Sequence, residues 1–111
     1  MCHCRSCRRA NGAPSVAWVV FRSNECELLA GEPARFGSSP GVTRTFCGHC
    51  GTPLTYQSES RAEYIDVTTA TLDDPDAYPP TKEIWTEHRI AWEPTNEKIP
   101  QFPQSSLIRK E

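Results

Sequence analysis

The chain has 111 residues, a formal net charge of −2 and a hydrophobic content of 37%. This length is near the commonest domain size, so we expect residues 1–111 to form one domain with a modest core. The charge balance lacks the basic excess of a nucleic-acid-binding protein. No apolar run approaches the roughly 20 residues that a membrane-spanning helix needs. We therefore expect a cytoplasmic protein that binds neither nucleic acid nor membranes.

Short strand candidates separated by turn residues follow one another along the chain. Residues 37–41, with the sequence GSSPG, predict a loop, and residues 72–75 (LDDP) predict a turn or a capped helical turn. Ten prolines and no convincing long helix favour a mainly β fold built of antiparallel strands. The predicted strands are residues 15–21, 26–30, 34–36, 42–46, 52–57, 64–69 and 81–86.

Five of the six cysteines fall into two clusters, Cys2, Cys4 and Cys7 in one and Cys47 and Cys50 in the other. A C-x-x-C turn can aim two sulfurs at a metal ion about 2.3 Å away, and two such turns complete a tetrahedral zinc site. Cys2 is one thiol more than a shared four-thiolate site would use. Three thiolates with an open fourth position are what a catalytic zinc requires, so all five cysteines are candidate metal ligands.

The second C-x-x-C pair lies between two predicted strands, residues 42–46 and 52–57. It should therefore sit at the tip of a hairpin, as in a zinc-ribbon knuckle. Disulfide bonds are an alternative, because six cysteines permit fifteen pairings. Against them, the chain starts without a charged segment and an apolar segment of a secretory signal, and closely spaced thiols are poor partners for long-range bridges. Redox chemistry of a C-x-x-C pair is a further alternative.

Other candidate groups have simpler interpretations. His3 and His49 each lie between two ligand cysteines, where side chains usually point outward. Cys26 alternates with two glutamates, which predicts a buried strand thiol, and His88 is expected at the surface.

Arginines surround the first cysteine cluster, at Arg5, Arg8 and Arg9. Arg5 and Arg8 are candidates for binding an anionic substrate, such as the carboxylates of a thiol peptide. The alternative is that these arginines only offset the charge of the thiolates.

Several separate motifs resemble one known family in the order in which the family has them. They are CHCRSCRR at residues 2–9, SSPG at 38–41, RTFCGHCGTPL at 44–54, TLDDP at 71–75 and a late tryptophan, Trp92. Over nearly its whole length the chain is thus similar to the glutathione-dependent formaldehyde-activating, or centromere-protein-V-like, family. The resemblance implies a β-tent fold of antiparallel sheets that carries two zinc sites.

Carried over to this sequence, the resemblance makes Cys2, Cys4 and Cys7 the ligands of a catalytic zinc. It makes Cys47 and Cys50 half of a structural zinc site. The family's first C-x-C pair and its strand are missing, because this sequence begins at the catalytic cluster. Either Met1 is not the natural start, or Cys47 and Cys50 leave their site empty or recruit Cys4 and Cys7 into one shared site.

The activity implied by the resemblance is that of a zinc-dependent carbon-sulfur lyase, similar to S-(hydroxymethyl)glutathione synthase. Such an enzyme joins a glutathione-like thiol to a small aldehyde. The alternative is a non-catalytic, zinc-ribbon-like module that binds a protein partner. Metal stoichiometry separates the two, because one closed site of Cys4, Cys7, Cys47 and Cys50 would favour the module. The oligomeric state is not readable from the sequence.

Overall fold

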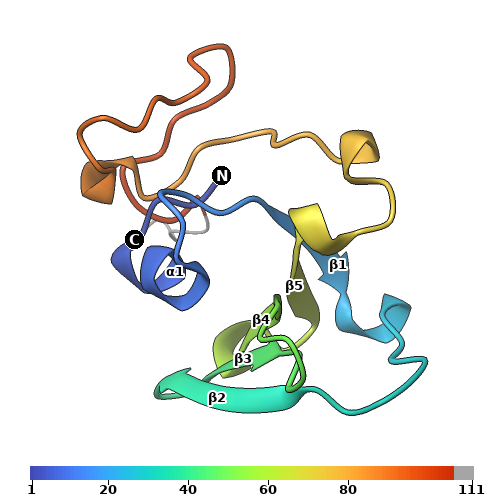
Figure 1. The fold of residues 1–111 in the computed structure, drawn as a ribbon. Coiled ribbons are helices and arrows are strands. Elements are labelled where there is room, and N and C mark those ends of the chain that lie inside the picture. Colours follow the sequence, from blue (N-terminus) through green and yellow to red (C-terminus); the bar gives the residue numbers. More distant parts are fainter. Residues whose placement is uncertain (107–111) are drawn as a thin grey trace. The chain divides into compact units, whose positions relative to one another are not determined.

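The computed structural model describes residues 1–106 and divides them into two compact units. One unit joins Met1–Ala17 to the segment from Asp76 onward, and the other is Trp18–Pro75. Figure 1 labels the helix and the strands of both units. The described residues are mainly β, with one antiparallel sheet and one α-helix.

The unit Trp18–Pro75 consists of a five-stranded antiparallel sheet (Figure 1). Its strand order is β1-β5-β4-β3-β2, so β1 and β2 form the two edges. Neighbouring strands along the chain pair directly from β2 to β5, and β1 joins the far edge by pairing with β5. The strands are β1 (Trp18–Arg22), β2 (Ala34–Ser39), β3 (Val42–Phe46), β4 (Pro53–Ser58) and β5 (Tyr64–Thr68).

Five of the seven predicted strands are confirmed, and β3 has the predicted bounds. The prediction that residues 37–41 form a loop is wrong for its first half, because β2 continues to Ser39. The turn itself uses Gly41, whose φ of +77° is in the left-handed region that glycine adopts without a steric cost. The backbone carbonyl of Gly41 also accepts a hydrogen bond from the Glu59 amide at 2.8 Å, which ties the turn to the end of β4.

Residues 26–30 do not form the predicted strand, and the prediction of a buried Cys26 is also wrong. Cys26 follows a 3-10 turn at Ser23–Glu25 and is exposed. Leu28 and Leu29 next to it are exposed as well, at 62% and 86%. Residues 26–30 form no bridge within residues 1–106, although the edge strands β1 and β2 each have one unpaired side, so a preference for extended backbone alone did not make this segment a strand.

Polar side chains fill the buried positions of the sheet. Thr45 and Thr68 are buried, and the Thr45 hydroxyl lies 2.5 Å from that of Thr55 on the adjacent strand β4. Arg44 is buried too, and its guanidinium lies over the ring of Tyr56, 4.9 Å from the ring centre. These hydrogen-bonded and cation-π pairs satisfy groups whose burial would otherwise be unfavourable.

The other unit contains the helix α1 (Arg5–Asn11) and extended segments that pair through isolated bridges. Residues 81–86 do not form a continuous strand as predicted. Only Glu83 and Ile84 pair there, Ile84 with Cys2 and Glu83 with Gln101. The apolar side chains buried among the described residues are Cys2, Cys7 and Val16, all in this unit. Two of the three are candidate metal ligands, so the core of the unit is built around the cysteine cluster.

Candidate metal centre

Helix α1 begins inside the first cysteine cluster and sets the spacing of two of its thiols. Cys4 is the N-cap residue, with φ −67° and ψ 152°, and its sulfur accepts a hydrogen bond from the Cys7 amide at 3.3 Å. The helix ends at Gly12, whose φ is +60°. Cys4 and Cys7 therefore lie at the start of a helix, whereas the sequence suggested a turn like that of the second pair. Sequence patterns missed this helix because cysteine is not among the preferred N-cap residues.

The extended segment Met1–His3 places Cys2 beside the helix start. The Cys2 amide and carbonyl exchange hydrogen bonds with Val16 at 2.7 and 3.0 Å. On the opposite side, the amide of His3 donates to the carbonyl of Ile84 at 3.1 Å. The amide of Ile84 donates to the carbonyl of Met1 at 2.9 Å. Cys2 is thus held from both sides by backbone pairing, which fixes the direction of its side chain.

These elements bring the sulfurs of Cys2, Cys4 and Cys7 within 4.8 Å of one another. We call these three residues the cysteine cluster. Cys2 and Cys7 are buried, and Cys4 is half-buried. Sulfurs bound to one tetrahedral zinc ion are about 3.8 Å apart, given a zinc–sulfur distance of about 2.3 Å. A small closing movement would therefore suffice for the cluster to hold a metal ion.

The ionisation of the three thiols also favours metal binding. Hydrogen bonds with Cys4 and Cys7, followed by burial, raise the pKa of the Cys2 thiol. Three crowded thiols cannot all become anions without a positive charge between them, and a divalent metal ion supplies that charge. The donor set therefore fits a soft or borderline metal ion such as Zn²⁺.

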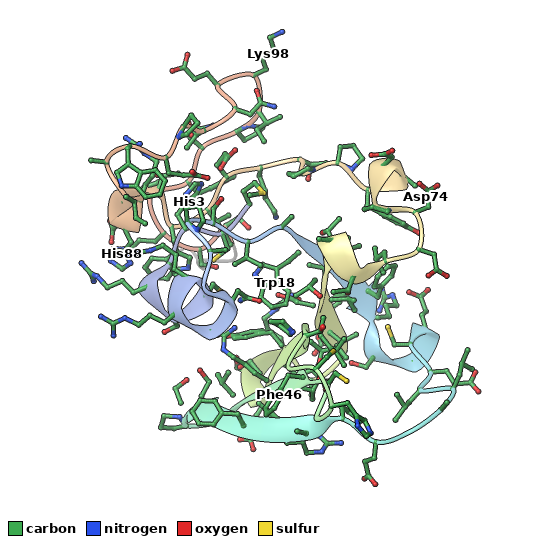
Figure 2. The ribbon with its side chains drawn as sticks, in the orientation of Figure 1. His3, Trp18, Phe46, Asp74, His88 and Lys98 are labelled. Carbon is green, nitrogen blue, oxygen red and sulfur yellow. The ribbon has the colours of Figure 1, made fainter. Side chains whose placement is uncertain are left out.

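His3 does not point outward, contrary to the sequence-based expectation. Its side chain, labelled in Figure 2, is 1% exposed, and its Nε2 lies 2.6 Å from Oε1 of Glu83, which is itself buried. Neither ring nitrogen of His3 joins the group of three sulfurs. No sequence signal connected His3 to Glu83, because the two residues are 80 positions apart and neither lies in a motif with the other.

The three arginines near the cluster differ in their surroundings. Arg8 is half-buried, and its Nε donates to the carbonyl of His3 at 3.3 Å. Arg5 and Arg9 are exposed. Arg8 is thus the arginine whose position is fixed by the segment that carries the cluster.

Cys47 and Cys50 lie in the unit Trp18–Pro75, in the connection between β3 and β4. Their position at a hairpin tip is confirmed. The Cys47 amide donates to Thr52 at 2.8 Å, and the Gly51 amide donates to Cys47 at 2.7 Å. Cys50 and His49 are exposed, and Cys47 is half-buried. Within Trp18–Pro75, no third histidine, cysteine or carboxylate joins this pair in a cluster of three.

Hydrogen bonding also changes the reactivity of the exposed thiol at this tip. The Thr52 hydroxyl lies 3.0 Å from the sulfur of Cys50. Hydrogen bonds from Thr52 and Cys47 lower the pKa of the Cys50 thiol. A thiolate is the form that binds metals and attacks electrophiles, so this pair is chemically suited to either role.

The fold and the cluster together define a small, mainly β protein with a three-cysteine site able to hold a metal ion. A family model described as glutathione-dependent formaldehyde-activating enzyme matches residues 1–88 of the 111-residue chain. The chain therefore belongs to this family. The matched range contains every cysteine discussed above. A comparison with curated proteins gave no match. Among the described residues, no helix is long and apolar enough to cross a membrane.

Proposed function

We propose that this protein is a zinc-dependent carbon-sulfur lyase that forms or cleaves the adduct of a glutathione-like thiol with a small aldehyde. The observation that carries the proposal is the convergence of the Cys2, Cys4 and Cys7 sulfurs within 4.8 Å in a chain of this family. In this proposal the three cysteines hold Zn²⁺ and leave its fourth position for an exogenous ligand.

The adduct reaction needs few groups. A bound zinc ion would keep the incoming sulfur deprotonated near neutral pH. In the forward direction the thiolate sulfur forms a bond to the carbonyl carbon. The C=O π bond breaks, and its electron pair moves to the carbonyl oxygen, which becomes an alkoxide. That oxygen takes up the proton that the thiol lost to solvent, so the product is a hydroxyalkyl thioether. The reverse reaction regenerates thiol and aldehyde, and neither direction requires an oxidant.

The chain's own residues would hold and orient the thiol substrate. Cys4 is the half-buried member of the cluster, so the side of the cluster nearest Cys4 is the accessible one. Arg8 is fixed by its bond to the His3 carbonyl and retains donors for a carboxylate of the substrate. Arg5 is exposed and would attract the same anionic group at longer range. A peptide thiol such as glutathione offers both the sulfur and the carboxylates.

For Cys47 and Cys50 we propose a structural role as metal ligands. Their hairpin geometry and the lowered pKa of Cys50 support it. We further propose that residues 1–111 act as one zinc domain and work in the cytoplasm, where thiols stay reduced. All six cysteines are free thiols in this structure.

The test is to replace Cys7 by serine and to measure bound zinc together with adduct formation from glutathione and formaldehyde. Cys26→Ser is the matched control, because Cys26 is an exposed cysteine outside both candidate sites. We expect Cys7→Ser to lose zinc from the cluster and to lose activity, and the control to keep both. Full activity in Cys7→Ser would refute the catalytic assignment. A single closed zinc site with no exchangeable ligand would favour the protein-binding module instead.

A further inference from the structure

The segment that carries Cys2 has two faces, and only one of them belongs to the cysteine cluster. Cys2 and His3 are neighbours in an extended segment, so their side chains point to opposite sides of the backbone. The paired segment alternates in the same way, with Glu83 on the side of His3 and Ile84 on the side of Cys2. The His3–Glu83 contact therefore lies behind the cluster, on the reverse face of the same backbone.

Glu83 is anchored independently of His3. Its Oε2 accepts a hydrogen bond from the Asn96 amide at 3.0 Å. Its backbone amide donates to Pro100 at 2.9 Å, and its carbonyl accepts from Phe102 at 2.8 Å. The later part of the chain thus holds the Glu83 backbone by two hydrogen bonds and its carboxylate by one, which leaves Oε1 placed for His3.

The tautomer of His3 follows from this contact. A proton must lie between Nε2 of His3 and Oε1 of Glu83, since two lone pairs 2.6 Å apart would repel. With Glu83 ionised, Nε2 is the donor, and the buried Nδ1 has no hydrogen-bond partner among residues 1–106. An unpaired buried acceptor costs free energy, which the strong Nε2–Glu83 bond offsets. The His3 ring is therefore held in one orientation by Nε2, although its Nδ1 makes no hydrogen bond.

We propose that Glu83 and His3 are positioning residues for the metal centre. The His3–Glu83 hydrogen bond fixes the backbone of the Met1–His3 segment from the side opposite the cluster. It thereby holds the Cys2 and Cys4 sulfurs in place before a metal ion binds. It acts through the backbone, and His3 is not itself a ligand. This inference rests on the metal site of the proposed function.

The experiment compares the full chain with its Glu83→Gln and Glu83→Ala variants. Glutamine keeps the volume and one acceptor oxygen, which can serve His3 Nε2 or the Asn96 amide but not both, whereas alanine removes both acceptors. Zinc affinity is measured by competition with a chromophoric chelator, and the coordination geometry by the absorption spectrum of the Co²⁺-loaded proteins. We expect the affinity to fall about tenfold or more in Glu83→Ala, with Glu83→Gln between the two and an altered cobalt spectrum in Glu83→Ala.

A matched control separates positioning from general destabilisation. Glu93→Ala removes a hydrogen bond of similar length, from the Ser15 hydroxyl to Glu93 Oε2 at 2.7 Å, in the same unit but without His3 as a partner. We expect this variant to keep the wild-type zinc affinity and cobalt spectrum. An equal loss in Glu93→Ala and Glu83→Ala would overturn the proposal.

Histidine labelling with ¹⁵N tests the role of His3 directly, since the chain has only three histidines. In the metal-loaded protein we expect His3 to carry its proton on Nε2, with Nδ1 free of metal. Coupling of Nδ1 to bound ¹¹³Cd would make His3 a ligand and overturn the positioning role. So would a Glu83→Ala protein with the affinity and spectrum of the wild type. A wild-type chain whose cluster binds no zinc would overturn the proposed function and this inference together.

Discussion

The side chains of His3 and Glu83 meet at 2.6 Å although the two residues are 80 positions apart in the chain. Both are buried, His3 at 1% and Glu83 at 3% exposure. The contact joins the segment that carries two candidate metal ligands to the segment that pairs with it. It is a polar contact buried behind the cysteine cluster, and its energetic coupling can be measured.

We expect His3→Ala and Glu83→Ala each to destabilise the metal-free protein by about 3 kcal/mol, because each leaves a buried polar partner unpaired. The double variant should cost clearly less than the sum of the two. Chemical denaturation of the four proteins gives the coupling energy. Additive effects would show that the two side chains contribute to stability independently of each other.

Zinc binding at the cysteine cluster should weaken as the pH falls. The raised pKa of Cys2 means that its thiol form prevails in the metal-free protein, so zinc must displace a proton to bind. Each proton released changes the apparent affinity by about tenfold per pH unit. Competition titrations between pH 6 and 8 measure the slope, and a pH-independent affinity would contradict thiolate ligation. The Cys7→Ser variant should show a smaller slope at its residual affinity.

Cys50 should react faster than Cys26 with iodoacetamide in the metal-free protein near neutral pH. Both thiols are exposed, but the pKa of Cys50 is lowered by the Thr52 hydrogen bonds. The pKa of Cys26 is raised by partial desolvation and by Glu25. A lower pKa gives a larger thiolate fraction below pH 9 and hence faster alkylation.

Mass spectrometry of the labelled peptides gives the two rates. Thr52→Val removes the hydroxyl and should slow the alkylation of Cys50 without changing that of Cys26. Added zinc should protect Cys50 if the pair binds metal as proposed, whereas equal rates with and without zinc would argue against a metal there.

Replacing Arg8 by alanine should raise the KM for an anionic thiol by about threefold to tenfold, with little change in zinc affinity. The physical reason is that Arg8 is the arginine fixed against the His3 carbonyl beside the cluster. Arg9→Ala is the control, since Arg9 is on the same helix and exposed. Steady-state kinetics are measured with glutathione and with an uncharged thiol. The KM for the uncharged thiol should be the same in Arg8→Ala and the wild type, which separates lost recognition of the carboxylate from a general loss of activity.

Gly41→Ala should destabilise the protein by about 1–2 kcal/mol. Gly41 has a φ of +77°, and an added Cβ would lie 3.2 Å from Oε1 of Glu59. Gly37→Ala is the matched control on the preceding strand, where an added Cβ meets no atom within 4 Å. Thermal unfolding of the two variants should show a loss for Gly41→Ala and little change for Gly37→Ala. A similar loss in both would point to strand propensity as the cause.

Local patterns predicted the sheet well where strands follow one another closely. Residues 42–46 and 52–57 were predicted because they alternate around a turn-forming pair, and β3 and β4 lie there. The segment at residues 26–30 has a similar alternation but no partner strand, so it stays irregular. Alternation indicates a preference for an extended chain, whereas a strand also needs a partner whose side chains it can pack against.

The cysteine spacing by itself determined which thiols gather at the amino-terminal cluster, because Cys2, Cys4 and Cys7 lie within one short segment that cannot separate them far. It also determined the class of metal that they suit. Only the tertiary structure decided what supports them: the helix that starts at Cys4, and the burial of His3 against Glu83. Contacts across 80 residues depend on which segments pair and on which face each side chain takes, and no local pattern encodes either.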